Sequence, residues 1–206
     1  MNVVAFIPAR GGSKRIPGKN MREVGGLSLV EHAITQAIDA GIERVVLSTD
    51  DPRIAHGHDY VGTEIHRRPA HLATDDAQIE DAIAHWAETG GDWDAMVLLQ
   101  PTSPLRRPET IRRCLRAMPD GEGSAYATVC RRDVCHGRPG EPASYGLTDV
   151  DVGCVYAFTR EHWEIERCRY ATHSWEVPID RFEAWEVDEP LDLVVVEALL
   201  AARDAT

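Results

Sequence analysis

The chain has 206 residues, of which 43% are hydrophobic, and its formal net charge at pH 7 is -12. This length predicts a single domain over residues 1–206, and the acidic charge argues against non-specific nucleic-acid binding, which needs a basic surface. No apolar stretch approaches the roughly 20 residues that span a bilayer, and the first residues lack the basic start of a secretory signal. We therefore expect a cytoplasmic protein whose partners include neither nucleic acid nor membrane.

The first predicted element is a buried strand, the apolar run from Val3 to Ile7. A glycine-rich stretch follows, in which Gly11 and Gly12 let the backbone approach a ligand closely. The stretch places four cations within ten residues, namely Arg10, Lys14, Arg15 and Lys19. The stretch matches neither the G-x-x-x-x-G-K-[ST] phosphate loop nor the G-x-G-x-x-G dinucleotide pattern. Because it connects a strand to a helix, we expect an anion site here rather than a basic surface loop.

Strands and helices then alternate as far as residue 118. Strands are predicted at 44–49, 61–65 and 95–100, and helices at 27–38, from Pro52, at 79–86 and at 108–118. This alternation predicts an α/β fold with a parallel sheet. Ligands of such sheets bind at the carboxyl ends of the strands, so we expect Gln100 to Arg106 to face the same crevice as Arg10 to Asn20.

The segment at about 131–151 combines glycines and prolines with little periodicity, which predicts an irregular excursion or a lid over the site. Its basic residues either bind an acid or form a solvated loop; they are Arg131, Arg132, His136 and Arg138. Further strands are predicted at 125–130 and 152–158 and within 175–185, and a closing helix at 190–202.

Two carboxylates precede the closing helix. Alternation at the end of a strand would place Glu186 and Asp188 on the same side, and carboxylate oxygens are the ligands that Mg²⁺ prefers. The alternative is that Asp188 caps the helix that begins at Pro190. Spacing alone favours the capping role.

Six motifs resemble those of the acylneuraminate cytidylyltransferases, the family that makes CMP-sialic acid and related activated acidic sugars. They are IPARGGSKRIPGKN at 7–20, STDD at 48–51, RPAHLATD at 68–75, LLQPTSPLR at 98–106, G-x-x-Y at 153–156 and D-x-x-x-D-L at 188–193. The resemblance implies a three-layer α/β/α, Rossmann-like nucleotidyltransferase fold with a mainly parallel sheet. It also implies a Mg²⁺-dependent reaction in which an acidic acceptor attacks the α-phosphate of CTP and pyrophosphate leaves.

Carried over position by position, the resemblance implies a role for each matching residue. The catalytic residues would be Arg10, Lys19 and Asp188. The metal ligands would be Asp188 and Glu186, the latter standing where the family usually has a second aspartate. The nucleotide would be bound by Arg10, Gly11, Gly12, Ser13, Lys14, Lys19, Asn20 and Arg68. The acceptor would be bound by Gln100, Val152 and Tyr156, while Arg106 would brace its loop.

Val152 departs from the family, because sialate enzymes usually have asparagine there and valine cannot form the amide's hydrogen bonds. We therefore expect an acceptor other than N-acetylneuraminate, either another nonulosonic acid or a small phosphonate. A homodimer is the family's arrangement, but the segment at 131–151 is shorter than the excursion that forms its dimer contact. Two further readings stay open: a nucleotidyltransferase that uses another nucleotide such as GTP, and a nucleotide-binding protein without catalysis.

Overall fold

A computed structural model describes residues 1–57, 63–118, 123–135, 144–172 and 174–204, with the backbone alone described at 129–135, 144–150 and 204. Seven strands form one sheet in the order β5-β4-β1-β6-β8-β7-β9. Their bounds are β1 Val3–Pro8, β4 Arg44–Thr49, β5 Thr63–Arg67, β6 Ala95–Leu98, β7 Ser124–Cys135, β8 Ser144–Thr159 and β9 Ser174–Pro178. Strands β5, β4, β1 and β6 pair in parallel, and β8 runs antiparallel to both β6 and β7. The mainly parallel sheet is therefore confirmed.

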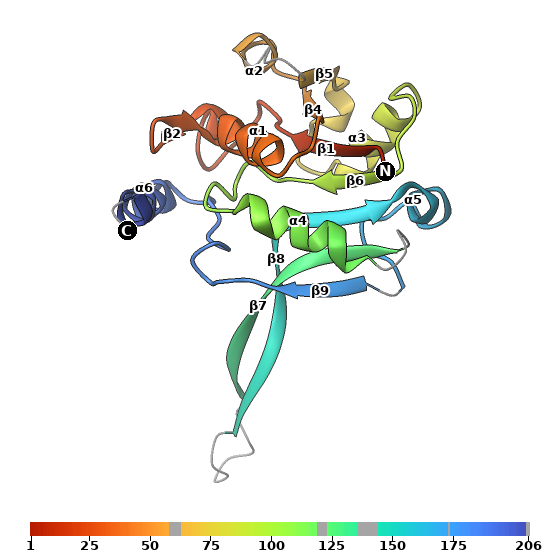
Figure 1. Ribbon diagram of the computed structural model, residues 1–206. Helices are drawn as coiled ribbons and strands as arrows, with labels where there is room; N and C mark the ends of the chain where they lie inside the picture. Colours follow the sequence, from red (N-terminus) through yellow and green to blue (C-terminus); the bar gives the residue numbers. More distant parts are fainter. Residues whose placement is uncertain (58–62, 119–122, 136–143, 173, 205–206) are drawn as a thin grey trace.

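Helices cover both faces of this sheet (Figure 1). Their bounds are α1 Leu29–Asp39, α2 Pro52–Gly57, α3 Ile79–Ala87, α4 Pro108–Ala117, α5 Arg160–Glu166 and α6 Pro190–Asp204, with short 3-10 turns η1 Lys19–Met21 and η2 Ala70–Leu72. Buried side chains of α1 and α4, such as Ile34 and Ile111, pack on one face of the sheet. Those of α3 and α5, such as Trp86 and Trp163, pack on the other. These are the three layers expected from the sequence.

Local signals in the sequence explain where α1 begins and ends. Ser28 accepts a hydrogen bond from the Glu31 backbone N–H and the Glu31 side chain accepts one from the Ser28 N–H, which is a capping box. Gly41 follows the helix with a φ of 87°, a conformation that favours glycine. The prediction placed Leu27 in this helix. That residue instead lies in a small hairpin, β2 Glu23–Val24 and β3 Leu27–Ser28.

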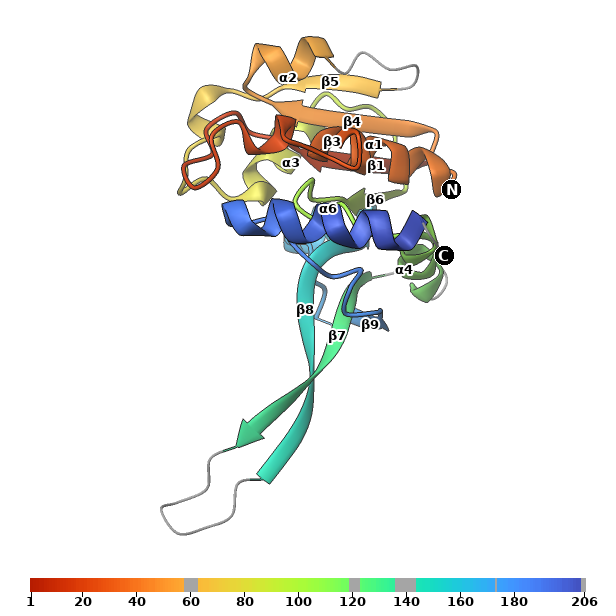
Figure 2. The ribbon, with the colours of Figure 1, turned by 90° about the vertical axis from the view of Figure 1, so that its left-hand side faces the viewer.

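The irregular excursion predicted at 131–151 is wrong for the described part of that segment. Strands β7 and β8 pair regularly from Arg131 opposite Thr148 to Cys135 opposite Ser144. They form a twisted two-stranded ribbon that extends away from the body of the molecule (Figures 1 and 2). A ribbon without a core beneath it needs no apolar alternation, so its sequence resembles that of a loop. Residues 136–143 lie outside the described chain, and a lid function stays a prediction.

Helix α6 crosses the side of the molecule close to the connection that follows β1 (Figure 2). Its residues Val196 and Leu200 are buried against Ile16 and Val24. This contact brings the segment just before α6 next to the cationic stretch after β1.

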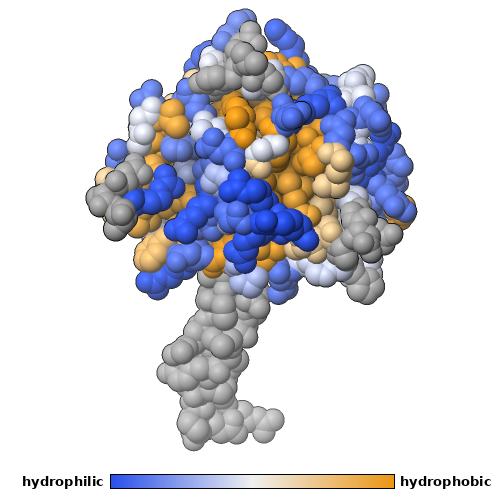
Figure 3. All heavy atoms as spheres, in the orientation of Figure 1, coloured by the Kyte–Doolittle hydropathy of each residue, from blue (hydrophilic) through white to orange (hydrophobic). Residues whose placement is uncertain are grey.

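No described helix combines the length and apolar character needed to cross a membrane. On the face seen in Figure 3, strongly hydrophilic residues cover α4 and apolar surface lies beside them.

Candidate active site

A cleft of about 360 Å³ lies where the parallel strands end. It is lined by Pro8, Arg10, Ser13, Lys19, Asn20, Arg68, Leu72, Thr74, Asp75, Ala77, Gln78, Ile79, Gln100, Pro101, Thr102, Glu186 and Asp188. Arg10 follows β1, Arg68 follows β5 and Gln100 follows β6, as expected for ligand sites of open α/β sheets. The predicted meeting of the two loops after β1 and β6 is therefore correct.

The connection after β1 is held by polar contacts on both sides. Arg10 Nη1 donates to the Thr74 carbonyl and contacts Asp75 Oδ1, each at 2.9 Å. Lys14 also pairs with Asp75, and a neighbouring hollow lined by Lys14 and Arg15 adjoins the cleft. Buried Asn20 lines the cleft and donates from Nδ2 to the Arg10 carbonyl at 2.9 Å, which fixes the shape of the connection. The cations of this connection thus gather at the cleft and at the hollow that adjoins it.

Gly11 is required by close packing. Its N–H donates to Asp50 Oδ1 at 2.9 Å, and a Cβ at this position would lie 2.7 Å from Asp51 Oδ2 and 2.8 Å from Asp51 Cβ. Asp51 cannot move away easily, because it accepts hydrogen bonds from the Arg53 N–H at 2.8 Å and from Arg53 Nη2 at 2.7 Å. Gly12 has open space around it. Close packing therefore excludes a side chain at Gly11 but not at Gly12.

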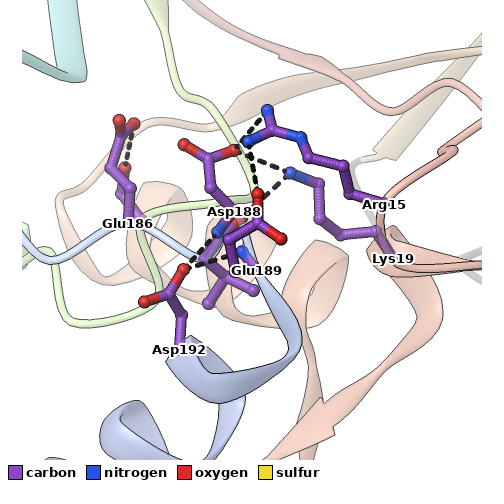
Figure 4. Close-up of polar contacts among 8 residues, drawn as sticks. Arg15, Lys19, Glu186, Asp188, Glu189 and Asp192 are labelled. Carbon is purple, nitrogen blue, oxygen red and sulfur yellow. Dashed lines mark hydrogen bonds and ion pairs between the residues drawn. The ribbon is translucent and has the colours of Figure 1, made fainter.

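Lys19 joins the connection after β1 to the segment before α6. Its ammonium group donates to the Val187 carbonyl at 2.9 Å and to Asp188 Oδ1 at 3.1 Å, and its side chain is only 14% exposed. Arg15 donates to the same Asp188 oxygen at 3.3 Å and to Glu189 at 3.1 Å. In Figure 4 both cations point at Asp188 and contact its carboxylate. An anion that enters would compete with these carboxylates for the cations.

Glu186 and Asp188 lie on the same side, as predicted, but not because of a strand. Residues 185–188 are outside any strand, and the Val187 N–H donates to the Thr102 carbonyl at 2.7 Å. The buried Val187 thereby leaves both neighbouring carboxylates facing the cleft (Figure 4). Burial, together with the nearby charge of Asp188, raises the pKa of Glu186 to about 7.

The carboxylate of Asp192, rather than that of Asp188, orders the turn at the start of α6. Asp192 Oδ2 accepts hydrogen bonds from the Asp188 N–H at 2.9 Å and the Glu189 N–H at 2.7 Å. The Asp188 carboxylate instead points into the cleft. One carboxylate therefore orders the start of α6, and the other stays available to a ligand.

Arg68 is the most buried cation of the cleft, with 8% exposure. Its Nε donates to Ser48 Oγ at 3.1 Å and its Nη2 to the Ser48 carbonyl at 3.0 Å. Burial lowers the pKa of Arg68 to about 10, with nearby Arg10 lowering it further and Asp50 raising it. A buried guanidinium with a lowered pKa that lines a cleft together with two further cations, Arg10 and Lys19, indicates an anion site.

The carboxylates suit a Mg²⁺ ion that is also held by phosphate. Among the described residues no group of three or more histidine, cysteine or acidic side chains could hold a metal alone. Glu186 and Asp188 supply two hard oxygen donors beside three cations of the cleft. Mg²⁺ is commonly bound by one or two carboxylates together with substrate phosphates, and the residues present fit that mode.

Of the three predicted acceptor residues, only Gln100 belongs to the described lining of the cleft. Gln100 lines the cleft, and Arg106 Nη1 donates to its carbonyl at 3.1 Å, so Arg106 does brace that loop. Val152 instead packs against the core, and Tyr156 donates its hydroxyl to Asp151 at 2.8 Å. Neither belongs to the described lining of the cleft. The side chains of Arg131 and Arg132, and all of His136 and Arg138, lie outside the described part of the chain.

The sequence analysis gave no role to three residues that lie against side chains of the cleft. Asp75 pairs with Arg10 and Lys14, and Ser103 Oγ donates to Glu186 at 3.4 Å. Gly153 has a φ of 70°, and a Cβ there would lie 2.9 Å from Glu186 Oε1. All three belong to the motifs that carry the resemblance, so the motifs were the signal that could have found them.

The three-layer arrangement is the nucleotidyltransferase fold. A solved structure of CMP:2-keto-3-deoxy-manno-octonic acid synthetase complexed with CTP matches 98% of this chain and 100% of its own, with a TM-score of 0.69 and 23% identity. The chain belongs to the cytidylyltransferase family, because the family model described as Cytidylyltransferase matches residues 4–134. The family inferred from the motifs is therefore confirmed, while Glu186 and Asp188 lie beyond the matched range.

Curated relatives match over part of this chain. The chain is 40% identical over 121 residues to CMP-N,N'-diacetyllegionaminic acid synthase of Legionella pneumophila, covering 56% of this chain and 52% of that protein. It is 30% identical over 128 residues to N-acylneuraminate cytidylyltransferase B of Danio rerio, covering 62% of this chain and 30% of that protein. The matches thus span about half or less of these relatives.

Proposed function

We propose that this chain is a CTP-dependent cytidylyltransferase that transfers CMP to an acidic sugar acceptor and releases pyrophosphate. The observation that carries the proposal is the single cleft in which Arg10, Lys19 and Arg68 face Glu186 and Asp188. Cations suit the phosphates, and paired carboxylates suit the divalent ion that accompanies a nucleoside triphosphate. Membership of the cytidylyltransferase family favours CTP over GTP as the nucleotide.

In this reaction the acceptor's hydroxyl oxygen forms a bond to the α-phosphorus, and the bond from that phosphorus to the bridging oxygen of pyrophosphate breaks. The hydroxyl proton passes to solvent. Phosphoryl-type transfer depends mainly on positioning and charge neutralisation, so no covalent enzyme intermediate is needed. When bound between Glu186 and Asp188, Mg²⁺ would supply further neutralisation of phosphate charge.

Residues at different positions in the cleft would bind different parts of the substrates. Lys19 and Arg10, together with Ser13 and Lys14, would hold the triphosphate, while Gly11 and Gly12 would let the backbone approach it. Arg68 and the loop ordered by Asn20 would hold the nucleoside side. Arg10 and Lys19 would neutralise the charge that develops on the leaving pyrophosphate.

Gln100 would meet the acceptor, because it lines the cleft beside Glu186. The names of the three matched proteins each pair a cytidine nucleotide with an acid, which supports an acidic sugar as acceptor. Val152 and Tyr156 lie outside the described lining of the cleft, so their effect on the acceptor would be indirect; the Tyr156 hydroxyl and the Gly153 N–H both donate to Asp151. A small phosphonate is the competing acceptor.

Pyrophosphate release with CTP and Mg²⁺ tests the proposal. The acceptor panel should contain N-acetylneuraminate, other nonulosonic acids, 3-deoxy-manno-octulosonate and small phosphonates. Release with a sugar acid supports the proposal, and release with a phosphonate alone would move the protein to another substrate class. Preference for GTP, UTP or ATP at equal concentration would refute the cytidine assignment. CTP binding without release for any acceptor would indicate a non-catalytic nucleotide-binding protein.

A further inference from the structure

A line of hydrogen bonds runs from the surface of α3 to Arg68 in the cleft. His85 Nδ1 lies 2.8 Å from His66 Nε2, and His66 Nδ1 lies 2.9 Å from Ser48 Oγ. Ser48 Oγ in turn accepts from Arg68 Nε at 3.1 Å. The register of β4 and β5 places Ser48 directly opposite His66. Ser48 is fully buried and His66 is 7% exposed, whereas His85 is partly exposed.

The donors and acceptors along this line fix its direction. A guanidinium only donates, so Ser48 Oγ accepts from Arg68 and has one hydrogen left to give. Within the described part of the chain, His66 Nδ1 is the one acceptor in contact with that hydroxyl. His66 then carries its hydrogen on Nε2 and donates it to His85 Nδ1. With both imidazoles neutral, each group in the line has a partner, and successive hydrogen bonds strengthen one another.

Proton uptake at His85 would reverse this line. A protonated imidazole donates from both nitrogens, so His85 Nδ1 could no longer accept from His66. His66 would have to accept at Nε2 and carry its hydrogen on Nδ1. Two donors, from His66 and Arg68, would then converge on Ser48 Oγ, and the buried hydroxyl hydrogen would have no acceptor. A buried polar group without its partner is costly, so the guanidinium loses its fixed support.

We propose that His85, His66 and Ser48 are positioning residues that hold the Arg68 guanidinium toward the cleft, and that proton uptake at His85 weakens nucleotide binding there. The anchoring at Ser48 leaves Arg68 Nη1 as the guanidinium nitrogen without a hydrogen-bond partner among the described residues. This inference rests on the proposed function, since it takes the nucleotide as the ligand of Arg68.

The surroundings of His66 favour the neutral form of its imidazole. His66 is faced by Glu64 of its own strand, by Arg68 just after that strand and by His85 from α3, and Phe6 of β1 packs on it with ring centroids 6.2 Å apart. Burial, followed by His85 and Arg68, lowers the pKa of His66 to about 4. His66 therefore stays neutral near pH 7, and His85 is the member of the pair in contact with solvent.

The test is calorimetric measurement of CTP affinity between pH 5.5 and 8.0. His85→Asn places an amide oxygen near the position of Nδ1, where it accepts from His66 without titrating. The ratio of variant to wild-type affinity should rise by about tenfold from pH 8.0 to pH 5.5, as expected for one lost hydrogen bond. The terminal phosphate titrates in this range too, but the ratio cancels its contribution. The matched control is His56→Asn on α2, which should follow the wild-type profile.

A second pair of variants tests positioning at pH 8.0. His66→Leu leaves the Ser48 hydroxyl without an acceptor and should weaken CTP binding by about tenfold, whereas His66→Asn restores an acceptor and should recover most of the affinity. Thermal unfolding checks that each variant folds; if His66→Leu does not, the pH profile of His85→Asn carries the test. A constant affinity ratio for His85→Asn, or an equal effect of both His66 variants, overturns the proposal.

Arg68→Ala separates this inference from the proposed function. If wild type binds CTP and Arg68→Ala weakens binding, the nucleotide assignment stands whatever the histidine variants do. If Arg68→Ala binds CTP like wild type, or wild type binds none, the proposed function fails. The inference about the histidines then fails as well, because it takes the nucleotide as the ligand of Arg68.

Discussion

Lys19 donates to Asp188 Oδ1 at 3.1 Å and so connects the cationic stretch after β1 to the carboxylates before α6. The two residues are 169 positions apart in the chain. The same ammonium group also donates to the Val187 carbonyl, and Val187 is fully buried against α6. The cation and the carboxylate of the proposed reaction are therefore in contact with each other, which orients both before any substrate binds.

Lys19→Ala should lower cytidylyl transfer by two or more orders of magnitude. The variant removes a charge that neutralises the phosphates and also the contact that orients Asp188. Steady-state pyrophosphate release measures the loss, and thermal unfolding checks the fold. Arg22→Ala is the matched control, since it removes an exposed cation of the same connection outside the cleft lining. Activity retained in Lys19→Ala would show that the site is misplaced.

Asp188→Asn should also lower turnover by two or more orders of magnitude and raise the Mg²⁺ concentration needed for half-maximal rate. The amide keeps the shape of the side chain and can still accept from Lys19, but it has lost the negative charge that a hard cation requires. A Mg²⁺ titration of the rate measures the change. Glu189→Gln is the control, because that exposed carboxylate pairs with Arg15 and does not line the cleft. An unchanged Mg²⁺ requirement would contradict the metal assignment.

The sequence predicted the site best where one continuous motif builds it. The stretch after β1 carries its own glycines and cations, so their convergence follows from a single connection between strand and helix. The placement of Glu186 and Asp188 was predicted correctly for a wrong reason. Alternation in a strand was expected, but an extended segment held by the Thr102 carbonyl and Lys19 produces the same arrangement.

Long-range register was the part that the sequence did not reveal. Ser48 and His66 meet only because β4 and β5 pair in one particular register, and His85 reaches them only because α3 covers that face. The helix α5 was missed, since its seven residues are too few to show an apolar period. The fold class followed from the order of elements, whereas the support behind Arg68 depends on contacts between elements.

Gly11→Ala should lower the free energy of unfolding by about 1–3 kcal/mol, because an overpacked site forces its neighbours to shift. The new Cβ would meet the Asp51 side chain at 2.7–2.8 Å, and Arg53 holds that side chain in place. Urea denaturation measures the difference. Gly12→Ala is the matched control for stability, since a Cβ there meets nothing within 4 Å. Equal stabilities of the two variants would refute the packing explanation for Gly11.

Glu186 should make the protein less stable as pH rises through neutrality when no divalent ion is present. Its folded pKa, about 7, lies above the ordinary value of 4.5, so between these values the native state binds more protons than the unfolded state. Stability from this group is fully present below pH 4.5 and is lost as pH rises toward and through 7. At roughly 1.4 kcal/mol per pH unit over the interval from 4.5 to about 7, the loss is at most about 3.5 kcal/mol and is reduced by the partial exposure of the side chain.

Glu186→Gln removes this titration while keeping an acceptor for the Ser103 hydroxyl. With a chelator present, the variant should be more stable than wild type at pH 8 by about 1–3 kcal/mol, and the difference should shrink toward pH 5. Urea denaturation at the two pH values measures it. Mg²⁺ should reduce the difference at pH 8, because the cation favours the charged carboxylate that only wild type has. A variant whose stability relative to wild type is the same at pH 5 and pH 8 would show that Glu186 titrates as an ordinary exposed carboxylate.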